Sequence, residues 1–283
     1  MALSLMYITN NTQVATIAQG AGVDRIFVDM EYIGKEERQK GMNTVKSNHT
    51  FEDVKAISAV TQKGNSQLLV RVNPIHESTK DYCSSKEEIE TTISCGADVI
   101  MLPMFKTRKE VEIFLNIAYG KVKTMLLLET KEAAEKIDEI ISVGGFDEIH
   151  IGLNDLHLSY GKKFMFELLS DGTVDKLAYM LNSNAIRFGF GGIARIGYGT
   201  LPAEYIIAEH YRLNSQAAIL SRSFCNSNAI KDTQAFRQLF NEEIKNIRNF
   251  EKKASDYTSD EYFNNHKTVV SLVEKIVEGL NGK

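Results

Sequence analysis

The chain has 283 residues, of which 43% are hydrophobic and 25% charged, the composition of an ordinary soluble globular enzyme with one large or two smaller α/β domains. Its formal net charge of −4 excludes general nucleic-acid binding, because no basic excess is present to displace counterions from phosphates. Three cysteines without paired spacing, Cys83, Cys95 and Cys225, indicate a reducing compartment and no disulfide framework.

The first residues, 1–8, lack a charged leader and a small-residue cleavage site, and their apolar run is too short to cross a membrane. We therefore interpret them as part of a first strand. The expected location is the cytoplasm, with no membrane contact.

From residue 5 onward, short apolar runs alternate with amphipathic stretches. Such runs are typical of strands buried on both faces of a parallel sheet. Strands are predicted at 5–9, 25–31, 67–73, 98–104, 123–130, 148–155, 187–195 and 217–223. Helices are predicted after Asn10 or Asn11, after Thr50, at 86–94, 107–118, 131–142 and 174–185, and from Pro202, while 156–173 is predicted to be a longer loop.

Eight strands, each followed by a helix and with no linker between them, favour one α/β domain, a closed (β/α)8 TIM barrel over residues 1–256. The pattern at 236–250 supplies the last helix of the barrel. An additional C-terminal helix is predicted within 257–283, and it is more apolar on one face than a free tail. Packing on its own barrel and packing on a neighbouring subunit both fit that face.

Polar residues end several of these apolar strands, and in a barrel of this type the chemistry lies at the carboxyl ends of the strands. The polar residues are Asp29, Glu31, Arg71, Asn73, Glu129, Asn154 and Asp155. Met104, which is apolar, ends another of these strands. Glu129 and Asp155 are one strand–helix–strand unit apart, so their carboxylates are expected to converge. Two carboxylates plus waters is the usual protein share of a Mg²⁺ or Mn²⁺ site, and solvated strand ends or salt bridges are the alternative.

Two further features stand near this acid pair. Gly152 lets the backbone approach a ligand closely, and amides in the turn through Asn154 and Asp155 can hold a carboxylate; a plain tight turn is the alternative. Arg71 lies within an apolar strand and cannot shed its charge, so it must pair with Asp29 or Glu31, with a substrate oxygen, or with both.

The segment 32–49 is polar and carries the charged run 35–40. A solvated surface explains that run most simply. A lid that closes over the strand ends and brings Lys35 or Arg38 to an anionic substrate is the other interpretation.

Taken together, five motifs resemble the HpcH/HpaI aldolase and citrate lyase β-subunit family, over about residues 20–225. They occur in the family's order: Asp29-Met-Glu31, Arg71-Val-Asn73, Ala97 to Met104, Leu128-Glu-Thr130 and Ile151 to Leu156. The resemblance implies a (β/α)8 barrel that uses Mg²⁺, Mn²⁺ or Co²⁺. It also implies trimers or hexamers in which a C-terminal helix is exchanged between subunits, which would account for the surplus helix at 257–283.

By the same resemblance, Glu129 and Asp155 are the metal ligands. Asp29 and Glu31 would hold the ligand-binding residues in place without binding metal or substrate themselves. Arg71 would contact the keto or enolate oxygen of the substrate, and the backbone from Gly152 to Asp155 its carboxylate, with Asn154 and Met104 beside it. The implied chemistry is reversible carbon–carbon cleavage, in which positive charge stabilises an enolate.

Tyr32 marks a departure, since pyruvate aldolases of the family carry a histidine after Asp-X-Glu and citrate-lyase-like members carry an acid. The candidates for the base are therefore Tyr32, His49 or a water on the metal. We expect a lyase of the 2-oxo-acid (pyruvate) aldolase type. The alternatives are a citrate-lyase-like enzyme acting on an acyl-CoA, with the basic residues of 35–46 as its only hint, and a non-catalytic ligand-binding barrel.

Overall fold

The computed structural model describes residues 2–34, 49–221, 224–225 and 232–281. Eight parallel strands close into a barrel in chain order, and β8 pairs with β1 to complete the ring. The strands are β1 (Ser4–Ile8), β2 (Arg25–Asp29), β3 (Gln67–Arg71), β4 (Val99–Leu102), β5 (Lys123–Leu128), β6 (Glu148–Ile151), β7 (Arg187–Ile193) and β8 (Ala217–Leu220). The predicted α/β barrel is confirmed.

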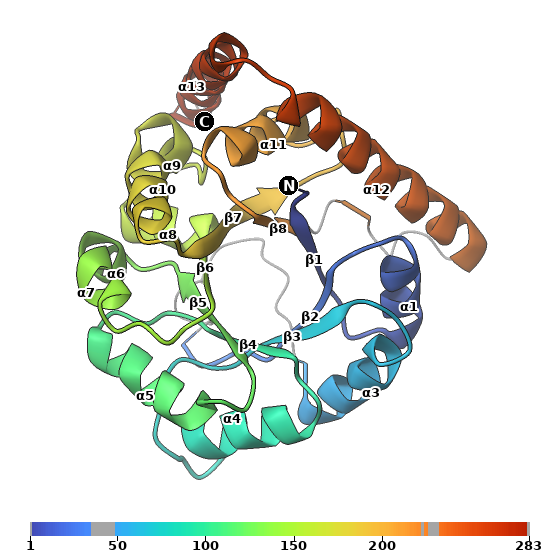
Figure 1. Cartoon of the computed structure of the whole chain (residues 1–283), viewed down its shortest axis with the longest axis vertical. Helices are drawn as coiled ribbons and strands as arrows, with labels where there is room; N and C mark the ends of the chain where they lie inside the picture. The colour runs from blue at the N-terminus through green and yellow to red at the C-terminus, as the bar shows by residue number, and fades with distance from the viewer. Residues whose placement is uncertain (1, 35–48, 222–223, 226–231, 282–283) are drawn as a thin grey trace.

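Helices up to residue 255 surround the barrel in the order of the sequence, so that the colours in Figure 1 run once around the ring, and the last helix turns back to lie over earlier ones. They are α1 (Thr12–Gly20), α3 (Phe51–Thr61), α4 (Ser85–Ser94), α5 (Arg108–Ala118), α6 (Lys131–Glu135), α7 (Ile137–Ile141), α8 (Leu153–Ser159), α9 (Glu167–Ser170), α10 (Thr173–Ser183), α11 (Ala203–Arg212), α12 (Thr233–Ser255) and α13 (Ser259–Asn281). None of the helices in the described part of the chain is long and apolar enough to span a membrane.

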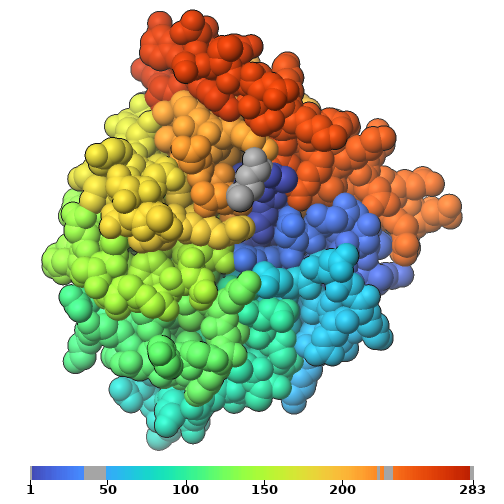
Figure 2. All heavy atoms as spheres, in the orientation of Figure 1, coloured from blue at the N-terminus to red at the C-terminus, as the bar shows by residue number. Residues whose placement is uncertain are grey.

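Side chains alternate between two apolar layers because successive residues of a strand face opposite sides of the sheet. One layer packs the outer face of the barrel against the helices. The other fills the barrel itself and is formed by Met6, Phe27, Leu69, Val99, Met101, Met125, Leu127 and Ala217. Figure 2 shows atoms covering the centre of the barrel on the face turned to the viewer. The buried inner residues make the ring a packed core.

Helix starts follow the polar residues that the sequence offers. Thr50, Ser84 and Thr107 each form a capping box, in which the side chain accepts from a backbone amide three residues later and the acid there bonds back. The predicted helix 131–142 is two helices, α6 and α7, divided at Lys136, whose φ of −110° and ψ of 29° leave the helical range. The predicted loop 156–173 is wrong in part, because α8 and α9 occupy much of it.

The floor of the barrel carries a buried ion pair between opposite strands. Arg25 of β2 donates to Glu148 of β6 at 2.6 Å, and the two side chains are 6% and 3% exposed. Glu148 also pairs with Arg187 of β7 at 3.3 Å. A buried carboxylate needs such partners, because leaving it unpaired in an apolar interior costs several kcal/mol.

The C-terminal helix α13 packs on its own barrel, against α9 and α11. Val269 and Val273 are buried there. Glu209 of α11, which is fully buried, accepts from Asn265 at 2.9 Å and lies 3.0 Å from the ring nitrogen of His266. Part of the apolar face expected for this helix is therefore covered within the chain, while Leu280 at its end is 45% exposed.

Candidate active site

The strand ends bring an arginine and two carboxylates into direct contact. Arg71, the last residue of β3, donates through Nε and Nη2 to both oxygens of Asp29 at 2.8 Å each. Its Nη1 lies 3.2 Å from Oε2 of Glu31. Asp29 and Glu31 are buried, whereas the Arg71 side chain is 13% exposed. A guanidinium has five N–H groups, so this arrangement fixes its plane and leaves two N–H groups for a ligand.

Electrostatics keeps that arginine charged. Burial opposes the charge, but Asp29 and Glu31 outweigh it and raise the pKa of Arg71 well above its ordinary value, with Glu129 adding to the effect. Among the described residues at these strand ends, Arg71 is therefore a permanent cation beside several acids. Whatever binds beside Arg71 meets a rigid, oriented positive charge.

Glu129 lies directly after β5 and is 2% exposed. Burial raises the pKa of Glu129 well above its ordinary range; Arg71 opposes this rise, and the nearby carboxylates of Asp155 and Glu31 add to it. A buried acid among other acids is stabilised by a proton or by a cation. Glu129 and Asp155 are therefore the carboxylates at this end of the barrel that could hold a divalent cation, since two carboxylates are the usual protein share of such a site.

Two backbone features shape the surroundings of Glu129. The amide of Met104 donates to Oε1 of Glu129 at 3.0 Å, from a residue with a left-handed φ of 53°. A Cβ on Gly152 would lie 2.9 Å from Cβ and 3.0 Å from Oε2 of Glu129, so only glycine fits beside this carboxylate. Met104 was predicted as a strand-end contact, and its backbone amide is the part that reaches Glu129.

Asp155 and Asn154 lie in the first turn of α8, which begins directly after Gly152. Asp155 is partly exposed and Asn154 is exposed. Asp155 lies close enough to Glu129 for its charge to raise the pKa of the Glu129 carboxyl, whereas Asn154 is on the exposed side of this turn. Within the described ranges, no group of three or more His, Cys, Asp and Glu side chains is arranged to hold a metal ion.

His49 returns to the end of β2 from outside that strand. The backbone N–H of Asp29 donates to Nδ1 of His49 at 3.0 Å. A neutral imidazole that accepts at Nδ1 carries its proton on Nε2, so the tautomer follows from this bond. In this arrangement His49 is a hydrogen-bond donor through Nε2.

Tyr32 lies on the outer side of the same rim and is 45% exposed. Its ring packs edge to face on Tyr82, with centroids 5.0 Å apart. Burial, followed by the charges of Glu88, Cys83 and Asp81, raises the pKa of the Tyr32 phenol. That direction disfavours the phenolate, so Tyr32 is a poor base near neutral pH.

Residues 35–48 lie outside the described part of the chain, and with them the lid interpretation of Lys35 and Arg38.

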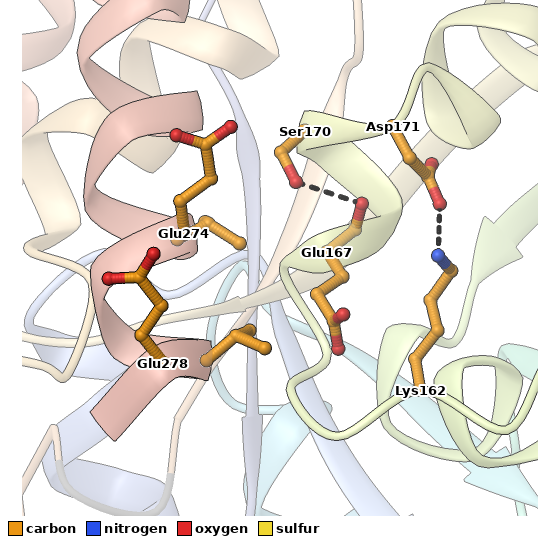
Figure 3. Close-up of a pocket in the computed structure, with 8 residues that line it drawn as sticks. Lys162, Glu167, Ser170, Asp171, Glu274 and Glu278 are labelled. Atoms are coloured by element: carbon orange, nitrogen blue, oxygen red, sulfur yellow. Dashed lines mark hydrogen bonds and ion pairs between the residues drawn. The ribbon is translucent and has the colours of Figure 1, made fainter. Parts of the chain in front are cut away.

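A separate cavity of about 260 Å³ lies between α13 and the segment that includes α9. Figure 3 shows Glu274 and Glu278 on one side of it and Glu167, Asp171 and Lys162 on the other. None of the strand-end residues lines this cavity.

Sequence reasoning missed Glu88 of α4, which is fully buried and bonds to Asn73 beside the site. In the sequence it is one acid among several in the first turn of a helix, where acids are common on exposed surfaces. No pattern in the sequence marks it as buried.

A family model for HpcH/HpaI aldolase/citrate lyase matches residues 3–166, more than half of the chain. The protein belongs to this family, which supports a lyase-type enzyme. No curated protein matches the chain in a sequence comparison.

Solved structures of similar shape include an HpcH/HpaI aldolase from Desulfitobacterium hafniense DCB-2, with 16% identity and a TM-score of 0.61 over 87% of this chain and 93% of that one. An HpcH/HpaI aldolase/citrate lyase family protein from Burkholderia cenocepacia J2315 has 14% identity and a TM-score of 0.61, covering 84% and 95%. The citrate synthase SbnG has 16% identity and a TM-score of 0.60, covering 78% and 85%. At these identities the likeness concerns the fold.

Proposed function

We propose that this protein is a divalent-metal-dependent aldolase that forms or cleaves a carbon–carbon bond next to a small 2-oxo acid such as pyruvate. The observation that carries the proposal is the charge arrangement at one end of the barrel. Arg71 is locked by Asp29 and Glu31 with two N–H groups left over, beside the buried carboxylate of Glu129. An oriented cation of this kind stabilises an enolate oxygen as its charge develops.

Glu129 and Asp155 are the residues that would hold the metal, Mg²⁺, Mn²⁺ or Co²⁺. The bound ion supplies Lewis-acid polarisation of the 2-oxo-acid oxygens. The chain positions these ligands itself, since the Met104 amide holds one oxygen of Glu129 and Gly152 leaves room for the other. The turn from Gly152 to Asp155 is the proposed position of the substrate carboxylate.

The chain's own residues divide the remaining work. The two remaining N–H groups of Arg71 bind the keto oxygen of the 2-oxo acid and orient it, and they bind the same oxygen more strongly when it becomes an enolate. His49 donates from Nε2 to the oxygen of the acceptor aldehyde, because its Nδ1 is already engaged by the Asp29 amide. Tyr32 forms a wall at the rim, and its raised pKa keeps the phenol protonated.

The test is direct turnover. The purified protein with Mn²⁺ or Mg²⁺ is mixed with a panel of 4-hydroxy-2-oxo acids, and pyruvate release is followed over time. Arg71→Ala is expected to lower the rate about 100-fold or more, as for other groups that stabilise developing charge. Arg108→Ala is the matched control, since Arg108 is an exposed arginine that pairs with Glu112 on its own helix and donates to Ser142, away from the strand ends.

An acyl-CoA panel is run in parallel with release of free CoA or acetyl-CoA as the signal. Release there without pyruvate formation from any oxo acid would replace the proposal with a CoA-ester lyase. No turnover on either panel, with metal bound, would support a non-catalytic barrel.

A further inference from the structure

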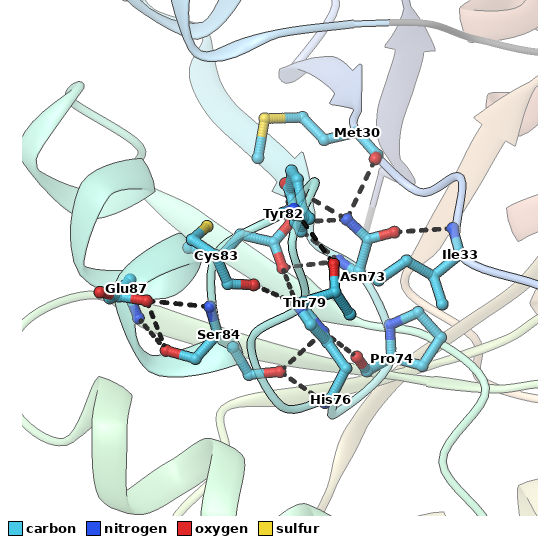
Figure 4. A network of polar contacts seen from close by, with 12 residues as sticks. Met30, Ile33, Asn73, Pro74, His76, Thr79, Tyr82, Cys83, Ser84 and Glu87 are labelled. Carbon is cyan, nitrogen blue, oxygen red and sulfur yellow. Dashed lines mark hydrogen bonds and ion pairs between the residues drawn. The ribbon is translucent and has the colours of Figure 1, made fainter.

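A network of buried polar groups behind the rim of the site converges on Glu88. Oε1 of Glu88 accepts from the side-chain Nδ2 of Asn73 at 2.8 Å, from the Tyr82 hydroxyl at 3.0 Å and from the backbone N–H of Asn73 at 3.1 Å. Figure 4 shows Asn73 at the centre of this network, between Tyr82 and Ile33. A fully buried carboxylate with this many donors is held in one orientation.

Asn73 has opposite polarity at its two ends, and each end has a defined partner. Its Oδ1 accepts from the backbone amides of Tyr32 at 2.9 Å and Ile33 at 3.0 Å. Its Nδ2 donates to Glu88 and, at 3.4 Å, to the carbonyl of Met30. A flipped amide would place its nitrogen against two N–H donors and its oxygen against a carboxylate. Glu88 therefore decides which end of Asn73 faces the segment after β2.

That segment carries Glu31, the second acid on Arg71. Asp29 belongs to β2 and holds Arg71 from within the sheet, but Glu31 lies beyond the end of the strand. The contacts that hold the chain before Tyr32 include the Met30 amide to the Arg71 carbonyl, the Met30 carbonyl to Nδ2 of Asn73, the Glu31 amide to Asp29, and the contact of Glu31 with Arg71. The next anchor along the chain is the pair of amide bonds to Asn73.

We propose that Glu88 and Asn73 are positioning residues of the candidate active site. Glu88 orients the Asn73 amide, Asn73 fixes the backbone at Tyr32 and Ile33, and this anchor keeps Glu31 on Arg71 and Tyr32 at the rim. The link from this anchor to turnover rests on the proposed aldolase function. The anchor itself is a property of the free protein and is measured without substrate.

The experiment reverses the polarity of the pair. Asn73→Asp keeps an oxygen toward Tyr32 and Ile33 but places a second carboxylate oxygen 2.8 Å from Oε1 of Glu88, where two acids repel. Adding Glu88→Gln supplies an amide that can donate to that oxygen. Native-state hydrogen exchange of the Tyr32 and Ile33 amides, measured at pH 8, reports on the anchor.

In Asn73→Asp, both amides are expected to exchange at least about tenfold faster than in the wild type, while amides of β5 stay protected. In Asn73→Asp with Glu88→Gln, exchange is expected to return to within about threefold of the wild type. Glu90→Gln removes an exposed acid of the same helix, which pairs with Lys121 and not with Asn73, so it is the control with unchanged exchange at these positions. Wild-type exchange in the single variant, or no recovery in the double variant, would overturn the proposal.

Turnover gives the second readout. In Asn73→Asp, kcat is expected to fall about tenfold with KM for the oxo acid within about twofold, and to recover in the double variant, because Glu31 is misplaced while the metal ligands are not. If the double variant recovers the slow exchange of the Tyr32 and Ile33 amides but the wild type releases no pyruvate, the proposed aldolase function is wrong. The positioning role of Glu88 and Asn73 would then still stand. If Asn73→Asp does not fold, Asn73→Ala with Glu88→Gln replaces it: fast exchange at Tyr32 and Ile33 supports the proposal, and wild-type exchange overturns it.

Discussion

The backbone amide of Met104 donates to Oε1 of Glu129 at 3.0 Å, and it does so with a left-handed φ of 53°. A side-chain-bearing residue in this region costs of order 1–3 kcal/mol and persists where the surroundings hold it. The strained turn after β4 and the carboxylate after β5 are therefore parts of one arrangement. Its consequence is that Glu129 has one oxygen fixed before any ligand arrives.

Removing the charge of Glu129 is expected to abolish metal binding without unfolding the protein. Glu129→Gln retains an oxygen for the Met104 amide, and Asp155→Asn is its companion. Loss of outer partners alone costs metal sites 10–100-fold, so the loss of a ligand is expected to weaken Mn²⁺ binding by about 100-fold or more. Titration calorimetry measures this, with the exposed acid in Glu132→Gln as the control. Undiminished affinity in both site variants would remove the metal site.

Gly152→Ala tests the space beside the carboxylate. The new Cβ would lie 2.9 Å from Cβ and 3.0 Å from Oε2 of Glu129, so that side chain must move by a few tenths of an ångström. We expect Mn²⁺ affinity to fall about tenfold and the free energy of unfolding to fall by roughly 1–3 kcal/mol. Gly20→Ala at the end of α1, where nothing lies within 4 Å, is the matched control and should be neutral. Equal behaviour of the two variants would contradict the crowding.

Arg71→Lys separates charge from geometry. A lysine keeps the positive charge but cannot donate two parallel bonds to Asp29 while also pairing with Glu31. Turnover is expected to fall about 100-fold or more with Mn²⁺ affinity kept, as judged by steady-state kinetics and calorimetry on one sample. Arg108→Lys serves as the surface control. Wild-type kinetics in Arg71→Lys would show that the planar fork has no role.

Acid sensitivity is expected from His150, a buried histidine of β6. Burial lowers the pKa of His150 to about 4, from an ordinary value of 6.5 in the unfolded chain. As pH falls between these two values, the unfolded state takes up a proton that the native state refuses, so the stability due to the neutral ring is lost toward acid pH. At up to about 1.4 kcal/mol per pH unit, His150 accounts for roughly 2 kcal/mol between pH 7 and pH 5.

Urea unfolding of wild type and His150→Gln at both pH values measures that difference. The wild type should lose more stability between pH 7 and pH 5 than the variant, by roughly the 2 kcal/mol assigned to His150. The same pH dependence in both proteins would show that His150 is not responsible.

Docking of α13 depends on Glu209. Glu209→Ala removes the acceptor of Asn265 and His266 and leaves Arg212, which donates to Glu209 at 2.6 Å, with only Asp175. Breaking a buried pair in this way costs about 3–5 kcal/mol. We expect α13 to become sensitive to limited proteolysis near residue 256 while the barrel remains folded. Glu242→Ala, which removes an exposed acid of α12, is the control. Equal resistance of both variants to proteolysis would show that Glu209 does not hold α13 on the barrel.

The barrel followed from the sequence because buried strands in a parallel sheet leave uninterrupted apolar runs. Strand limits were less exact: the run predicted at 25–31 ends as a strand at Asp29, since Glu31 turns away and its amide bonds to the Asp29 side chain. Glu129 and Arg71 could be selected because charged residues at the ends of such runs are conspicuous. The amide of Met104 and the carboxylate of Glu88 could not, because their roles depend on which neighbour the fold brings within 3 Å.

The ion pair between Arg25 and Glu148 has a consequence for how the protein can be divided. β2 and β6 lie in different halves of the ring, so the first four strands and the last four each contain one of the two buried charges. A fragment carrying the first four strands would keep Arg25 without the carboxylate that neutralises it, whereas Glu148 in the other fragment would keep Arg187 of β7. Reassembly of the two complementary fragments is therefore favoured over independent folding of the first, and the floor of the barrel acts as the recognition element between them.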